Sequence, residues 1–214
     1  MAAQRPSRPP GREPLSADRI VSAALVRIDA DGLDALSMRI LGSDLGVKAM
    51  SLYNYFDTKE LMLDAVVGEL IATIRLPDRI EGDWRAQIRV IAMAFRDIAT
   101  RHPNAFPLFV KRTLGAYVHG QALAERSIVT LVRAGFEEDT AIRAFRTIAR
   151  YVVGAAMTDS ASNAAEVSPD AEVSADAPLV NHAIHDLADT STDELFEFGL
   201  DLILDGLAAH LPRA

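Results

Sequence analysis

Residues 36–66 read LSMRILGSDLGVKAMSLYNYFDTKELMLDAV, and this stretch contains two short helices separated by a tight turn. Ser37 is a good N-cap, and the apolar spacing after it predicts a helix over Met38–Leu45. Gly46 ends that helix, because glycine readily adopts the left-handed conformation found after many helices. A second helix is then expected to begin at about residues 47–48 and to end near Tyr55.

The small and apolar residues of this stretch have the spacing of a helix-turn-helix. Gly42 is the small residue where the two helices cross, and Gly46 supplies the turn. Four apolar residues flank the glycines and lock the angle between the helices: Leu41, Leu45, Val47 and Leu52. The outward face of the second helix then starts with Lys48, which makes this helix a candidate for insertion into the DNA major groove.

Capping residues on both sides of the stretch predict two further helices. Ser16 precedes an amphipathic segment that stops at Gly32. Residues 57–60, Asp-Thr-Lys-Glu, have the form of a capping box with Asp57 or Thr58 as N-cap. They open a fourth helix that we expect to run to about Arg75, before a proline turns the chain.

Helical periodicity continues to the end of the chain and predicts an all-α protein. We expect an N-terminal three-helix head with a helix-turn-helix, followed by a C-terminal helical domain. The predicted parts are a disordered basic, proline-rich arm at 1–15, the head at 16–76, and the C-terminal domain at 77–214 with a mobile acidic loop at 158–178. The expected C-terminal helices are 84–100, 104–111, 114–134, 139–157, 179–188 and 192–210.

The charge of the chain is distributed unevenly. The net charge is -8, yet residues 1–60 carry eight basic and eight acidic side chains. Residues 151–212 hold twelve carboxylates and no lysine or arginine, so contact with phosphates is expected only near the N-terminus. The chain has no cysteine and no apolar run of membrane-spanning length, which predicts a cytoplasmic protein without disulfides.

Residues 16–66 as a whole resemble the DNA-binding signature of the TetR family of transcriptional regulators. The resemblance combines the LGV turn, the SLYNYF run and the KEL start of the fourth helix, in that order. It implies a homodimeric repressor that binds double-stranded operator DNA. The resemblance also implies that Tyr53, Tyr55 and Lys59 contact phosphates. A second set of residues is expected to approach base edges or nearby phosphates: Met38, Arg39, Lys48, Ala49, Met50 and Ser51. Arg39 is the strongest candidate base reader, since a guanidinium donates two hydrogen bonds to guanine.

The C-terminal part resembles the tetracycline-repressor-like branch of the family, in AMAFRDIATRHP (92–103), LVRAGF (131–136) and ARYVVGAAM (149–157). The resemblance implies a four-helix dimer interface. Apolar residues around the whole final helix fit that role, including Leu195, Phe198 and Leu202. A small-molecule effector is expected among residues 84–157, with candidate contacts Met93, Phe95, His102, Asn104, Phe106, Phe109, Arg112, His119 and Met157.

No cofactor or metal is expected. His182, His185 and Asp186 could share a helix face in an arrangement suited to zinc, but a polar surface turn is the favoured explanation because the sequence offers no obvious further ligand. Relatives that bind tetracycline with magnesium use histidines near the end of the fourth helix. This chain has Ile74-Arg75-Leu76 there, so tetracycline and magnesium are not the expected ligands. The alternatives to a DNA-binding repressor are an activator, a helical ligand-binding or interaction protein without DNA binding and, with the least support, an enzyme.

Overall fold

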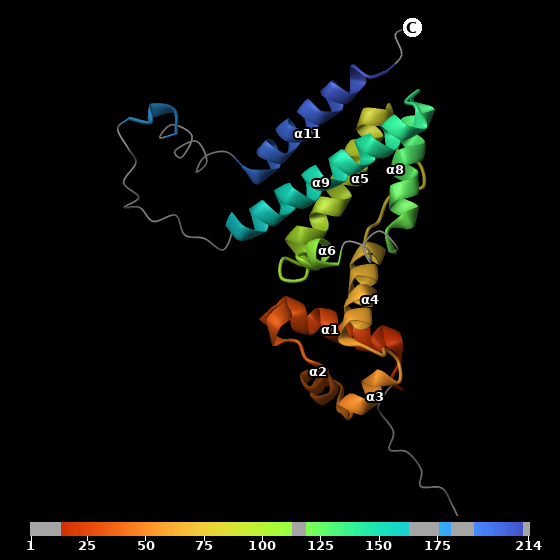
Figure 1. Ribbon diagram of the computed structural model, residues 1–214, viewed down its shortest axis with the longest axis vertical. Helices are drawn as coiled ribbons and strands as arrows, with labels where there is room; N and C mark the ends of the chain where they lie inside the picture. Colours follow the sequence, from red (N-terminus) through yellow and green to blue (C-terminus); the bar gives the residue numbers. More distant parts are fainter. Residues whose placement is uncertain (1–13, 113–118, 163–175, 181–190, 212–214) are drawn as a thin grey trace, which may run out of the picture. The chain divides into compact units, whose positions relative to one another are not determined.

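The computed structural model describes residues 14–112, 119–162, 176–180 and 191–211. All regular secondary structure in these residues is helical, which confirms the all-α prediction (Figure 1). The chain divides into two compact units, Met1–Val66 and Val67–Ala214. Helix α4 (Lys59–Ala72) contributes to both, and the expected boundary at residues 76–77 stays a prediction.

Helix α1 (Ala17–Asp31) begins and ends where the sequence predicts. The Ser16 hydroxyl accepts a hydrogen bond from the Arg19 backbone N–H, and Gly32 ends the helix with φ of 82°. A short 3₁₀ turn η1 (Leu33–Ala35) follows. The buried face of α1 consists of Ile20, Val21, Ala24, Leu25 and Ile28.

Helix α2 spans Met38–Leu45, as expected, and Gly46 follows it in the left-handed conformation, with φ of 65° and ψ of 36°. Helix α3 is shorter than expected and covers only Ala49–Tyr53. It starts late because Lys48 is still extended, and it ends early because the Tyr55 and Phe56 N–H groups both bond back to the Leu52 carbonyl.

Helix α4 starts with Thr58 as its capping side chain, since the Thr58 hydroxyl accepts from the Leu61 N–H. It ends at Ala72, before the expected Arg75. Side chains donate hydrogen bonds to carbonyl groups of the last turn there: the Thr73 hydroxyl donates to Leu70 O, and the Arg75 guanidinium donates to Ala72 O.

The second unit is a bundle in which one long helix contacts three others. Helix α9 packs against α5, α8 and α11 (Figure 1). The bounds are Trp84–Arg101 for α5, Leu108–Lys111 for α6, Gln121–Arg133 for α8, Glu138–Ser162 for α9 and Thr192–Ala208 for α11. The core between them contains Ile88, Leu131, Phe136, Ile148, Val152, Phe196, Leu200 and Leu204.

Three predicted segments of this unit differ from the structure. Helix α6 starts at Leu108 and not at Asn104, because residues 103–107 form turns in which the Ala105 and Phe106 N–H groups bond to the His102 carbonyl. Helix α8 begins only at Gln121, after Gly120 with φ of -88° and ψ of 9°. The first part of its predicted range, 114–118, lies outside the described residues.

Residues 158–162 belong to helix α9 and not to the expected loop. The Thr158 hydroxyl donates to the Gly154 carbonyl within the helix, and Asp159 accepts from Arg96 of α5. These bonds stabilise the helical conformation of the residues after Met157. The rest of the predicted loop, 163–175, and most of the minor helix at 179–188 lie outside the described residues.

Candidate nucleic-acid interface and ligand cavity

Gly42 sits where α2 and α3 approach most closely. A Cβ atom added there would lie 3.0 Å from the Val47 carbonyl oxygen and 3.1 Å from the Ala49 nitrogen, both backbone atoms that cannot move aside easily. Leu41, Leu45 and Leu52 are buried around this crossing. The structure therefore has the helix-turn-helix geometry that the spacing of these residues predicts.

The outward face of α3 is exposed. Met50 is 72% exposed, Tyr53 is 39% exposed, and Lys48 and Arg39 of α2 are also exposed. Ala49 and Ser51 are half-buried. This face thus combines two cationic side chains with an apolar tip and an aromatic ring, while the opposite side of α3 is held in the core by Leu52.

Met38 differs from the other predicted DNA contacts. Its side chain is only 6% exposed and belongs to the core of the first unit. As the first residue of α2, it points inward, whereas the next residue, Arg39, points to solvent. In this conformation the Met38 side chain is therefore turned away from solvent, and its contact with DNA stays a prediction.

Lys59 and Tyr55 make hydrogen bonds within the first unit. The Lys59 Nζ donates to the Leu36 carbonyl at 2.5 Å, and the Tyr55 hydroxyl donates to the Leu15 carbonyl at 2.6 Å. Lys59 keeps two further N–H donors for a phosphate, whereas Tyr55 has used its only one. Lys59 thus connects α4 to the segment before α2, and Tyr55 connects the turn after α3 to the segment before α1.

A bidentate ion pair fixes α1 against α2, and the sequence analysis missed it. The Arg27 Nε and Nη2 atoms donate to the two Asp44 carboxylate oxygens at 3.0 and 2.6 Å, and Nη1 donates to Asp31 at 2.5 Å. The hydrogen bonds that Arg27 donates to Asp44, and then the one that it donates to Asp31, raise the pKa of its guanidinium above the ordinary value. Because the pair is exposed to solvent, it contributes little to stability, and its main effect is to orient α1 relative to α2.

The second unit contains a cavity of about 490 Å³, within the usual size range of small-molecule sites. Its walls come mainly from α5, α8 and α9. The lining is Ile71, Ile88, Ile91, Ala92, Phe95, Phe109, Val110, Gly120, Leu123, Ala124, Ser127, Phe145, Arg146, Ile148, Ala149, Arg150, Val152, Val153 and Gly154.

Two of the nine predicted effector contacts, Phe95 and Phe109, line this cavity. Phe106 packs behind them, with its ring centroid 6.0 Å from that of Phe95 and 5.2 Å from that of Phe109. His119 instead lies against Gly68, where an added Cβ would come within 2.7 Å of its Nδ1. The cavity lining also excludes Met93, His102, Asn104, Arg112 and Met157.

The cavity walls on α8 and α9 fall within the expected range 84–157, but none of the predicted contacts lies on α8, and the one on α9, Met157, is not among the lining residues. Ile148 and Val152 of α9 are spaced one turn apart and face the cavity. Their spacing predicts an apolar helix face, but a pattern on one helix does not reveal which neighbour covers that face. Leu123 and Ser127 of α8 carry the same one-turn spacing.

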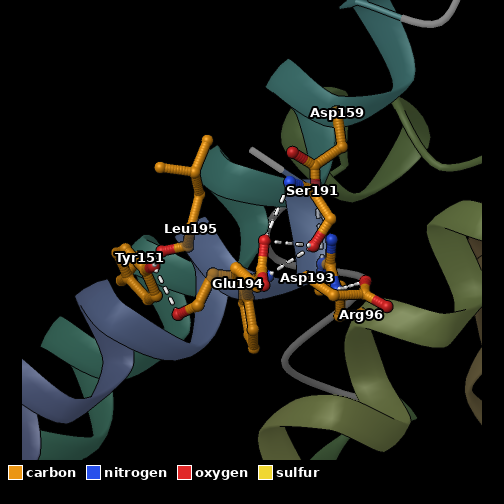
Figure 2. A network of polar contacts seen from close by, with 8 residues as sticks. Arg96, Tyr151, Asp159, Ser191, Asp193, Glu194 and Leu195 are labelled. Carbon is orange, nitrogen blue, oxygen red and sulfur yellow. Dashed lines mark hydrogen bonds and ion pairs between the residues drawn. The ribbon is translucent and has the colours of Figure 1, made fainter. Parts of the chain in front are cut away.

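A buried charge network holds the start of α11 (Figure 2). Arg96 of α5 is 7% exposed; its Nε and Nη2 donate to Asp159 of α9 at 3.0 and 2.7 Å, and its Nη1 donates to Asp193 of α11 at 2.6 Å. Its guanidinium carbon lies 4.6 Å from the Phe196 ring centroid. Burial lowers the pKa of Arg96, but the bonds and charges of the two aspartates outweigh it and raise that pKa overall.

Two further contacts in the same region position α11. The Tyr151 hydroxyl of α9 donates to the Phe196 carbonyl at 2.8 Å, and burial raises the pKa of this phenol. Ser191 and Glu194 form a capping box at the first turn of α11 (Figure 2). The Tyr151 ring also fills the space beside Gly199, where an added Cβ would collide with its hydroxyl.

One apolar face of α11 is uncovered in the described part of the chain. Phe198 is 64% exposed and Leu202 is 59% exposed, and Leu195 lies one turn before Phe198 on the same face. The opposite face, with Phe196, is buried in the bundle. Burial of both faces, as the sequence predicts, thus requires a surface other than the described part of the chain.

The described residues have neither a candidate membrane span nor a candidate metal cluster. None of their helices is long and apolar enough to cross a bilayer. They contain no group of three or more histidine, cysteine or acidic residues in metal-binding proximity. His182, His185 and Asp186 lie outside the described residues.

A three-helix unit with a glycine-locked helix-turn-helix, followed by a helical bundle, defines the class of helix-turn-helix transcriptional regulators. The chain belongs to the TetR family: residues 20–66 match the model of bacterial regulatory proteins of the tetR family, and residues 76–211 match the tetracyclin repressor-like C-terminal domain. The family is regulatory, so this protein is a DNA-binding transcription regulator and not an enzyme.

Individual relatives extend the likeness over most of the chain. The tetracycline repressor protein class A from transposon 1721 of Escherichia coli is 32% identical over 206 residues, 91% of each chain. The crystal structure of the Streptomyces coelicolor TetR family protein ActR in complex with actinorhodin aligns with a TM-score of 0.79 at 26% identity, over 94% of this chain and 100% of that one. BioQ with its double-stranded DNA operator aligns with a TM-score of 0.66 at 26% identity, over 92% and 100%.

Proposed function

We propose that this regulator represses transcription by binding a palindromic operator as a homodimer, and that it releases the operator when a small molecule enters its cavity. The observation that carries the proposal is that Lys48, Met50 and Tyr53, at the start and on the outer face of α3, are exposed. Arg39 of α2 is exposed as well. Such a face suits the major groove, because Arg39 can donate two hydrogen bonds to guanine and Met50 can contact a thymine methyl. The remaining proposed DNA contacts are Ala49, Ser51, Tyr55 and Lys59.

The uncovered apolar face of α11 supports a homodimer. Leu195, Phe198 and Leu202 leave a hydrophobic stripe in water, and a second copy of the same helix would cover it. A two-fold dimer presents two copies of α3 to two half-sites of a palindrome. The C-terminal match to tetracyclin repressor-like domains also supports this arrangement.

Helix α4 supports the proposed release mechanism. It runs without interruption from Lys59, a proposed DNA contact, to Ile71, which lines the cavity. A ligand that displaces the cavity end of α4 would alter the position of its DNA end, and a coupling of about 1–3 kcal/mol gives a 5–150-fold release. The solved ActR complex contains actinorhodin, which is consistent with effector control.

Repression is favoured over activation because the class A relative is named a repressor. An activator would make the same contacts with DNA. We place the protein in the cytoplasm, since the proposed operator of a bacterial regulator lies there.

Titration of the purified protein with duplexes from the flanks of its own gene tests the proposal. We expect binding to an inverted repeat whose half-site centres are about 34–36 Å apart, with affinity that falls steeply as salt rises. A scrambled duplex of equal length is the control. Equal affinity for both duplexes would show that the chain is not a sequence-specific regulator.

A further inference from the structure

The charged residues that line the cavity are two arginines of α9. Arg146 and Arg150 lie one helical turn apart, and no aspartate or glutamate is among the lining residues. The rest of the wall is apolar apart from the buried Ser127, whose hydroxyl donates to the Leu123 carbonyl. Both arginines are exposed to solvent. The site therefore combines an apolar interior with positive charge.

These two arginines differ from most others in the same acidic unit. Neither makes an ion pair or hydrogen bond within the part of the chain that the structure describes. By contrast, neighbouring arginines have carboxylate or carbonyl partners: Arg85 with Asp205, Arg89 with Asp201, Arg96 with Asp159 and Asp193, Arg101 with Asp97, and Arg126 with the Pro77 carbonyl. Carboxylates of α11 thus pair with Arg85, Arg89 and Arg96 of α5, whereas the two arginines of the cavity have no carboxylate partner among the described residues.

We propose that the effector is an amphipathic anion, in which a drug-sized apolar body fills the cavity and an acidic group binds Arg146 and Arg150. The proposal rests on the effector cavity of the proposed function and adds the chemical class of its ligand. A guanidinium donates two parallel hydrogen bonds to a carboxylate or sulfonate, and this pairing strengthens as the ligand excludes water. Because the protein carries a net charge of -8, its overall field disfavours anions, and selectivity for one must come from local charges.

A matched pair of fluorescent probes tests the charge requirement. The first is 8-anilinonaphthalene-1-sulfonate, and the second is N-phenyl-1-naphthylamine, which has the same apolar body without the anionic group. Dissociation constants of both are measured on the full chain by fluorescence titration. We expect Arg146→Met and Arg150→Met each to weaken the anionic probe about 5- to 20-fold and to change the neutral probe less than about twofold.

Three controls make the outcome decisive. Arg143→Met removes an arginine of the same helix that does not line the cavity, and it should leave both probes unchanged. Ala149→Trp fills the cavity and should weaken both probes, which locates them there. Unchanged binding of the neutral probe reports that the Arg146 and Arg150 variants are folded.

The proposal is overturned if the anionic probe does not bind, if the arginine variants weaken both probes equally, or if they weaken neither. Operator binding is measured in parallel without any probe. A failure of the proposed repressor function would appear there, and it would be distinct from a failure of the ligand class. Aliphatic carboxylates and phosphate monoesters are then compared as competitors of the anionic probe. The stronger competitor shows which of the two acidic groups the arginines prefer.

Discussion

The two units of this chain hold their helices in place by different means. In the first, most determinants act over a few residues: Ser16 and Ser37 cap the helices that follow them directly, and Gly42 and Gly46 shape one turn. In the second, Arg96 joins partners 63 and 97 residues away. Short-range determinants leave a recognisable pattern in the sequence, whereas long-range pairs do not, and four variants test that difference.

The largest effect is expected at the helix crossing of the first unit. Gly42→Val places a branched side chain against the Val47 carbonyl and the Ala49 backbone, and it should lower the free energy of unfolding by about 3 kcal/mol and abolish operator binding. Urea denaturation and operator titration measure the two effects. Ser43→Val, at the next and exposed position, is the matched control. A Gly42 variant as stable as this control would refute the close crossing.

The second unit should respond strongly to loss of its buried cation. Arg96→Met keeps an apolar stem but leaves Asp159 and Asp193 without their partner, and we expect a loss of about 2 kcal/mol in unfolding free energy. The loss stays below that of a fully buried pair, because Asp193 is largely exposed and can rehydrate. Arg101→Met, which removes an exposed pair with Asp97, should cost less than about 0.5 kcal/mol. Equal losses would show that burial of Arg96 has no energetic consequence.

The exposed face of the first unit should separate base reading from phosphate contact. Arg39→Ala is expected to cost about 1.5 kcal/mol of operator affinity and to relax the preference at one base position in each half-site. Lys59→Ala should weaken binding to all sequences alike and also reduce stability, because Lys59 bonds to the Leu36 carbonyl. Titration against single-base operator variants provides the measurement. If Arg39→Ala lowers the affinity for all operator variants equally, Arg39 contacts a phosphate and does not read a base.

The smallest effect is expected for a single hydroxyl in the second unit. Tyr151→Phe removes the bond to the Phe196 carbonyl and should lower the unfolding free energy by about 1 kcal/mol. Tyr53→Phe in the first unit is the control, since no hydrogen bond of its hydroxyl occurs within the described residues.

The raised pKa of Tyr151 adds a dependence on pH. An unfolded tyrosine ionises near pH 10, while the folded one keeps its proton to higher pH, so the contribution of Tyr151 is complete below about pH 10 and is lost as pH rises through the folded pKa. The stability difference between the chain and its Tyr151→Phe variant should therefore narrow under alkaline conditions. A constant difference would contradict burial of the phenol.

The helix-turn-helix was predictable from sequence almost to the residue. The bounds of α2 follow from Ser37 and Gly46 alone. The error at α3, which is shorter than predicted, arose because its ends depend on the backbone conformation of Lys48 and on a turn at Leu52. The family resemblance placed Met38 among the DNA contacts, and only the structure shows that its side chain packs inward.

The cavity was predictable only in outline. Phe95 and Phe109 belong to the expected region, but their partners on α8 and α9 are distant in sequence. Sequence alone determined the all-helical class, the caps and the glycine-locked head, because each depends on the intrinsic preferences of adjacent residues. Tertiary structure alone decided that Arg96 is neutralised by Asp159 and Asp193, because ion pairing depends on which helices pack together. For the same reason only the structure could place Arg146 and Arg150 at the cavity without an ion-pair partner in the residues it describes.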